Sequence, residues 1–127
     1  MTAMNNDSCF VGNNETPATN HLTFKIRTLN DTLRKTGSGG KVLITNGVLA
    51  LGTDFAGVAL KAVQAFDSFS DANDPWGEHD FGSCVVLHQR VLWKIDYYDR
   101  KAELHSPDPS CNKVTLRVLT IMLAEEY

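Results

Sequence analysis

The chain has 127 residues, of which 43% are hydrophobic and 21% are charged, and its formal net charge is −3. This composition is typical of one globular domain and excludes a disordered chain. Lysine and arginine are spread along the sequence, so no basic stripe favours nucleic acid as a partner. No run approaches the roughly 20 apolar residues that a membrane helix needs. Three cysteines without CxxC spacing, and a beginning that does not read as a secretion leader, predict a cytoplasmic location.

A polar stretch opens the sequence and is followed by a helical pattern. Residues 1–20 are rich in asparagine and lack hydrophobic periodicity, so we expect a flexible tail there and a single domain over residues 21–127. Gly37 is placed to end the following helix in a left-handed conformation. The helix itself is predicted by apolar residues at helical spacing, namely Leu22, Ile26, Leu29 and Leu33.

The next segment predicts two short strands and a second helix. The apolar run Lys41–Thr45 is typical of a strand. The Asn46-Gly47 turn would lead into residues 48–51, which either pair back as a second strand or continue the layer. Thr53 is the expected N-cap of the helix that follows. The buried face of this helix is predicted to hold Phe55, Val58, Ala59, Ala62, Val63 and Phe66.

A hairpin is predicted in the second half of the chain. Residues 81–87 and 90–98 read as two strands joined by the loop His88-Gln89. With a loop of these two residues, Cys84 would lie opposite Trp93 on the core side of the sheet.

The last apolar stretch, residues 112–125, predicts a helix because its apolar residues form a broad stripe at helical spacing. The expected order of elements is then α-β-(β)-α-β-β-α. This order predicts an α+β fold, a two-layer domain in which a small antiparallel sheet of about three or four strands is covered by about three helices.

The strand Arg90–Asp99 is the most distinctive candidate for a binding surface. Side chains alternate along a strand, so Trp93 would face the core while the opposite side presents charge and phenol groups. That side is either an interface, where tyrosine is favoured, or a solvated face with cross-strand ion pairs. Trp76, in an irregular loop, is either an exposed anchor or a lid over the core. The candidate binding surface consists of Trp76, Lys94, Asp96, Tyr98 and Asp99.

The run Glu78-His79-Asp80 is the sharpest candidate for chemistry. Imidazole and carboxylate groups can bind a divalent metal and activate water, as in hydrolases and nucleases. Adjacent side chains of an extended chain point in opposite directions, so we prefer an interpretation in which His79 and Asp80 bond loop amides. We therefore expect no metal and no other cofactor. In the alternative, Glu78, His79, Asp80 and Asp96 would be catalytic, and His79, Asp80 and Asp96 would bind the metal.

A weaker hypothesis is direct DNA binding by the basic flank of the first predicted helix. Its members would be Lys25, Arg27, Arg34 and Lys35.

Several strings of this sequence are similar to those of one known family. WKIDYYD at residues 93–99, SPDP at 106–109 and RVLTIMLAEEY at 117–127 resemble a bacterial family known as domain of unknown function 3768. The resemblance covers roughly residues 24–127. It implies a stand-alone bacterial cytoplasmic protein found on chromosomes and plasmids, and it implies no particular activity, substrate or cofactor.

The interpretation we favour is a small cytoplasmic protein-interaction module without catalytic activity. The plasmid and mobile-element association that the resemblance implies extends it to a regulator, or to an inhibitor of a host defence system. The expected partner is another protein rather than nucleic acid or a membrane. The broad apolar stripe of the last predicted helix leaves a homodimer open.

Overall fold

The computed structural model describes residues 18–127, with side chains from residue 21 onward, so most of the expected tail lies outside the described residues. Three α-helices and a C-terminal 3-10 turn are present in the described part: α2 (Ala18–Thr36), α3 (Asn46–Ala50), α4 (Thr53–Gln64) and η1 (Ala124–Glu126). The strands of that part are β2 (Lys41–Ile44), β3 (Phe81–Val86), β4 (Gln89–Tyr98) and β5 (Leu116–Leu123).

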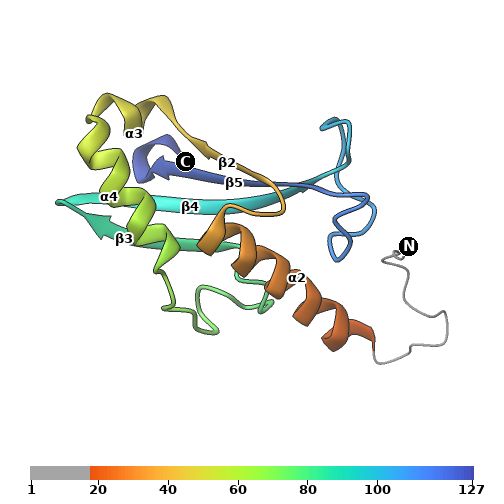
Figure 1. The fold of residues 1–127 in the computed structure, drawn as a ribbon. Helices are drawn as coiled ribbons and strands as arrows, with labels where there is room; N and C mark the ends of the chain where they lie inside the picture. Colours follow the sequence, from red (N-terminus) through yellow and green to blue (C-terminus); the bar gives the residue numbers. More distant parts are fainter. Residues whose placement is uncertain (1–17) are drawn as a thin grey trace.

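The four strands form one sheet in the order β2-β5-β4-β3. Strand β2 runs parallel to β5, whereas the β5–β4 and β4–β3 pairs are antiparallel. Helices α2 and α4 lie on one face of this sheet (Figure 1). Trp93 of β4 is fully buried in the core between the layers, where Phe66 and Phe69 contact it edge-on. The α+β fold is therefore confirmed, with a mixed sheet in place of an antiparallel one.

The face of the sheet opposite α2 and α4 carries no helix in the described residues, and we call it the helix-free face. Trp93 and Ile95 of β4 face the core as expected, so the residues between them point the other way. The centre of the helix-free face is buried at Leu92 and Met122, which are register partners. Its remaining β4 members are Arg90, Lys94, Asp96 and Tyr98, which are half-buried or exposed.

Helix α2 begins and ends largely as the sequence predicts. Its buried residues include Ile26 and Leu33 of the predicted stripe. Gly37 has a φ of 81°, and its amide donates to the carbonyl of Leu33 over 2.8 Å. A residue with a side chain is strained in this conformation, so glycine ends the helix here.

The predicted final helix is wrong, because this segment forms strand β5. The strand lies between β2 and β4 and is buried along most of its length on both faces. A strand with two buried faces has no polar alternation and reads as a continuous apolar run, which helical spacing also matches. Without this helix, the argument that left a homodimer open no longer applies.

The strand predicted over residues 48–51 is also wrong, since Asn46–Ala50 forms helix α3. Thr45 caps this helix by accepting a hydrogen bond from the amide of Val48. Glu126 accepts hydrogen bonds from the Thr45 hydroxyl over 2.7 Å and from the Gly47 amide over 3.1 Å. A side chain at Gly47 would overlap with this carboxylate, so the Asn46-Gly47 pair serves a contact with the C-terminus.

Helix α4 differs from its predicted pattern at two points. Its N-cap is Gly52, one residue before the expected Thr53. Val58, expected on the buried face, is 44% exposed, whereas Phe55, Ala59 and Val63 are buried.

The hairpin turns one residue earlier than predicted. Leu87 and His88 occupy the turn with φ of 48° and 72°, and Val86 pairs with Gln89. Trp93 consequently lies opposite Gly82 rather than opposite Cys84. The shift moves each partner by two residues, so the inward and outward sets are unchanged. A Cβ atom at residue 82 would overlap with the indole of Trp93, which explains why this register requires glycine.

Candidate functional site

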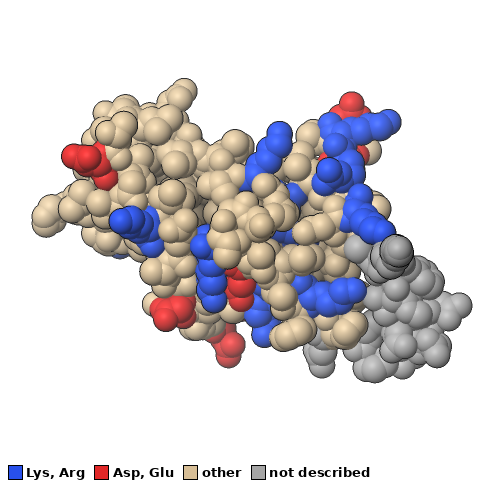
Figure 2. Space-filling view, viewed as in Figure 1, with Lys and Arg blue, Asp and Glu red and all other residues tan. Residues whose placement is uncertain are grey.

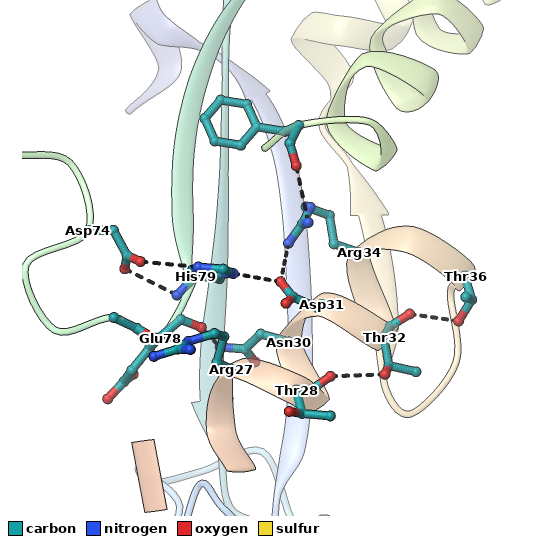
Figure 3. A network of polar contacts seen from close by, with 12 residues as sticks. Arg27, Thr28, Asn30, Asp31, Thr32, Arg34, Thr36, Asp74, Glu78 and His79 are labelled. Atoms are coloured by element: carbon teal, nitrogen blue, oxygen red, sulfur yellow. Dashed lines mark hydrogen bonds and ion pairs between the residues drawn. The ribbon is translucent and has the colours of Figure 1, made fainter. Parts of the chain in front are cut away.

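His79 is bonded to two carboxylates (Figure 3) and stacked on an aromatic ring. Its Nδ1 atom lies 2.9 Å from Oδ1 of Asp31 on α2, and its Nε2 atom lies 3.6 Å from Oδ2 of Asp74. The amide of His79 also donates to Asp74 over 3.1 Å. The imidazole stacks on Phe69 with 3.7 Å between ring centroids. His79 therefore fastens the loop that precedes β3 to helix α2 and to the core.

A buried arginine completes this network. Arg34 donates to Oδ1 of Asp31 over 2.9 Å and to the carbonyl of Phe66 over 3.1 Å. Its guanidinium lies over the rings of Phe69 and Trp93, 5.2 and 5.3 Å from their centroids. Burial by itself would raise the pKa of Asp31, but the hydrogen bonds from Arg34 and His79 outweigh it, so this pKa lies below its ordinary value.

A second buried network joins α2 to strands β4 and β5. Asn30 donates to the Tyr97 hydroxyl over 2.8 Å, and Tyr97 donates to the Glu78 carboxylate over 2.8 Å. Burial, and then the bond to Glu78, raise the pKa of Tyr97. Arg117, fully buried on β5, donates to the side-chain oxygen of Asn30 over 2.7 Å and to the carbonyl of Pro109. The Glu78 carboxylate therefore belongs to this buried hydrogen-bond network, through its bond from Tyr97.

The four residues of the metal hypothesis do not converge. His79 points to α2, and Glu78 is bonded to Tyr97. Asp80 and Asp96 share the lining of a different hollow, of about 350 Å³, at the end of β4. In residues 18–127 no group of three or more His, Cys, Asp or Glu side chains is placed to hold a metal ion.

Asp80 remains chemically distinctive within that hollow. Burial raises its pKa, and the charges of Glu78, Asp74 and Asp96 raise it further. The hollow is also lined by Tyr98 and His105. This part of the surface combines negative charge with aromatic side chains.

The predicted β4 binding residues fall into two groups. Lys94 bonds Asp96 along the strand over 2.6 Å, and this bond raises the pKa of Lys94. Tyr98 is 36% exposed at the end of the same row. Asp99 instead accepts the amide of Glu103 over 3.0 Å and lies in a turn, where bonds from backbone amides lower its pKa. Lys94, Asp96 and Tyr98 therefore share one surface, which Asp99 borders.

Trp76 is 79% exposed, so it does not act as a lid over the core. Its loop is anchored next to it, where Arg27 donates to the carbonyl of Gly77 over 2.7 Å. Two of the four basic residues of the DNA hypothesis are therefore engaged, Arg27 by this bond and Arg34 by Asp31. On the face that Figure 2 shows, lysine and arginine stand in separate groups among uncharged and acidic residues.

The two cysteines of the described residues differ in state. Cys84 on β3 is free, and burial raises the pKa of its thiol. Cys111 is held in a disulfide. The cysteine count is therefore no argument for a reducing compartment.

Sequence reasoning missed the structural roles of Asn30 and Arg117, and the hydrogen bond that Arg90 donates to the Ser83 hydroxyl across the hairpin. Asn30 lies four positions after Ile26 and three before Leu33, so helical spacing places it on the buried stripe. Arg117 lies inside an apolar run, where a buried arginine needs several acceptors. Arg90 carries no comparable signal, because arginine is common on exposed strands.

The fold and these contacts define an α+β protein with one helix-covered and one helix-free sheet face. The chain matches the family described as "Protein of unknown function (DUF3768)" over residues 44–126, and it belongs to that family. The match begins at the end of β2, so helix α2 lies outside the matched range. No curated protein and no solved structure matches the chain. No helix in residues 18–127 is long and apolar enough to cross a membrane.

Proposed function

We propose that this protein is a small protein-interaction module without catalytic activity, and that it binds its partner through the helix-free face along β4. The observation that carries the proposal is the exposure of apolar side chains on this face beside a charged pair. Leu43 of β2 and Val85 of β3 are 50% and 61% exposed at its two edges. Tyr98 and the Lys94–Asp96 pair lie between them along β4.

This combination is what a protein interface requires. Apolar side chains supply burial on association, and tyrosine supplies area together with a hydroxyl group that finds a partner. The Lys94–Asp96 pair offers both signs of charge to a partner, which favours specificity and orientation more than affinity. Trp76 is exposed on a loop that is anchored to helix α2, and we propose it as a second point of contact with the partner. Asp99 borders it at the end of β4.

The biological setting is part of the same proposal. We place the protein in the bacterial cytoplasm as a regulator, or as an inhibitor of a host defence system carried by a mobile element. The support is the family resemblance of the 93–127 segment.

The test is capture of a partner by the tagged protein and by a Lys94→Ala/Tyr98→Ala variant. A matched control is Lys61→Ala/Val58→Ala, which removes one lysine and one exposed apolar side chain from α4, on the helix-covered side. We expect the unmodified protein to capture a stoichiometric partner. The Lys94→Ala/Tyr98→Ala variant should lose this partner, and the control variant on α4 should keep it. Equal capture by all three folded proteins would show that the β4 surface is not used.

A further inference from the structure

Strand β3 lies at one end of the sheet, so its main chain is paired on one side only. The amide of Ile95 donates to the carbonyl of Asp80 over 2.9 Å, and the β3–β4 register continues this pairing. In an antiparallel pair, residues bonded to the partner alternate with residues whose N–H and C=O groups point away from it. Phe81, Ser83 and Val85 therefore direct their main-chain groups toward the free edge.

This edge lacks the features that protect edge strands from pairing. Proteins protect such edges with lysine, proline, a bulge or a very short strand. Strand β2, at the other end of the sheet, has four residues and begins with Lys41. Strand β3 has six residues, none of them charged and none a proline. Its edge can therefore accept another extended chain by strand addition.

Arg90 determines which charge such a chain should carry. It is exposed and is the register partner of Val85 on β4. Its Nη1 atom donates to the Ser83 hydroxyl over 2.8 Å, so the guanidinium reaches the middle of β3. A guanidinium has five N–H donors, and this bond uses one of them. None of the ion pairs formed by the described side chains includes Arg90.

A second copy of the chain is poorly suited to this edge. Antiparallel pairing of two β3 strands about Ser83 would bring two Arg90 guanidinium groups near each other on the same face, and like charges placed opposite each other are destabilising. A carboxylate at the same position would instead pair with Arg90.

We infer that the β3 edge binds an extended segment of a partner protein that carries Asp or Glu opposite Ser83 and apolar residues two positions to either side. Residues directly opposite each other share a face of the sheet, so the carboxylate lies near Arg90. The two apolar side chains lie beside Phe81 and Val85. This inference rests on the proposed function and extends the interface from β4 to the neighbouring edge.

The test uses a capped synthetic peptide, Thr-Val-Thr-Glu-Thr-Val-Thr, with amide hydrogen exchange of the full chain followed by NMR. Added peptide is expected to slow exchange several-fold at Phe81, Ser83 and Val85, whose amides face the free edge. Exchange at Gly82 and Cys84, whose amides face β4, should change little. A peptide with N-methyl groups on the amides that would face β3 should give no protection, because it cannot donate these hydrogen bonds.

The predicted pairing of a carboxylate with Arg90 is tested by changing the charge on either side. Replacing the peptide's Glu by Gln is expected to weaken binding by up to about fivefold, the upper end for an exposed ion pair. Arg90→Glu should reject the Glu peptide and accept one with Lys at that position. Lys61→Glu, the same charge change on α4, should bind like the unmodified protein.

Two results would overturn the inference. One is peptide binding that leaves exchange at Phe81, Ser83 and Val85 unchanged, or that ignores the charge at position 90. The other is protection of these amides from exchange that increases with protein concentration in the absence of peptide. Such protection would show that a second copy of the chain pairs with the edge. The capture experiment with Lys94→Ala/Tyr98→Ala tests the proposed function separately. If that variant loses its partner while the peptide test fails, binding through β4 stands and binding at the β3 edge does not.

Discussion

The imidazole of His79 lies parallel to the ring of Phe69, with an interplanar angle of 2° and 3.7 Å between the centroids. The same imidazole bonds Asp31 of α2, and Phe69 packs edge-on against Trp93 of β4. One residue therefore joins the loop between α4 and β3 to a helix and to the core. That loop carries Trp76, so the contact also sets the position of an exposed aromatic side chain of the proposed surface.

Replacing His79 by asparagine tests this contact. His79 has a φ of 56°, a conformation that asparagine adopts more readily than most residues, so the backbone is retained while the ring is lost. We expect the free energy of unfolding in urea to fall by about 1–3 kcal/mol, because a stacked ring and a hydrogen bond to a charged group are removed. His88→Asn is the control, since His88 has a similar φ of 72° but is exposed in the hairpin turn. Equal losses in the two variants would contradict the assigned role of His79.

The Asp31 carboxylate predicts how the fold responds to acid. Its pKa is lower in the folded protein than its ordinary value of 3.8, so it contributes stability that is fully present above pH 3.8 and is lost as the pH falls through the folded pKa. The urea midpoint of the unmodified protein should therefore exceed that of Asp31→Asn at pH 5, and the gap should narrow below pH 3.8. A gap that stays constant or widens in acid would show that Asp31 is not stabilised by Arg34 and His79.

The Asp80 carboxylate is expected to change the stability of the fold with pH in the opposite direction to Asp31. Its pKa is raised above 3.8 in the folded protein, so folding favours its protonated form, and stability is lost as the pH rises from 3.8 through the folded pKa. Asp80→Asn should therefore raise the thermal midpoint at pH 7, since it removes a partly buried charge that is repelled by Glu78. The gain should vanish near pH 3. A lower midpoint for Asp80→Asn at pH 7 would mean that the carboxylate makes a contact that outweighs this repulsion.

Gly82 tests the register of the hairpin. A methyl group at this position would overlap with the indole of the buried Trp93, so Gly82→Ala should lower the free energy of unfolding by about 1–3 kcal/mol. Gly57→Ala is the matched control, because nothing lies within 4 Å of a Cβ atom there and the residue is exposed on helix α4. That change should stabilise the helix by up to about 1 kcal/mol. If the two variants respond alike to denaturant, Trp93 does not lie opposite Gly82.

Patterns that depend on neighbours in the chain could be predicted from the sequence. The α2 stripe, its end at Gly37 and the inward set of β4 around Trp93 follow from residues three, four or two positions apart. Strand β5 could not be predicted in this way. Its apolar run is explained by the strands on both sides, and these come from residues far away in the sequence.

The candidate site was predictable to a smaller extent. The sequence places Glu78, His79 and Asp80 next to each other, but which way each side chain points depends on partners elsewhere in the chain. His79 bonds Asp31, 48 positions away, and Glu78 bonds Tyr97, 19 positions away. The Lys94–Asp96 pair was predictable because residues two apart on a strand share a face. Its partial exposure could not be predicted, because it depends on the fact that no helix of residues 18–127 covers that face.

Site-specific photo-crosslinking in bacterial cells that produce the protein tests the central claim most directly. A photoreactive amino acid is placed at residue 98 on the helix-free face and, in a separate protein, at residue 58 on the exposed side of α4. The proposed function predicts one defined covalent adduct with a second protein from position 98 and none from position 58. Adducts from position 58 alone, or equal adducts from both positions, would contradict binding through the β4 surface.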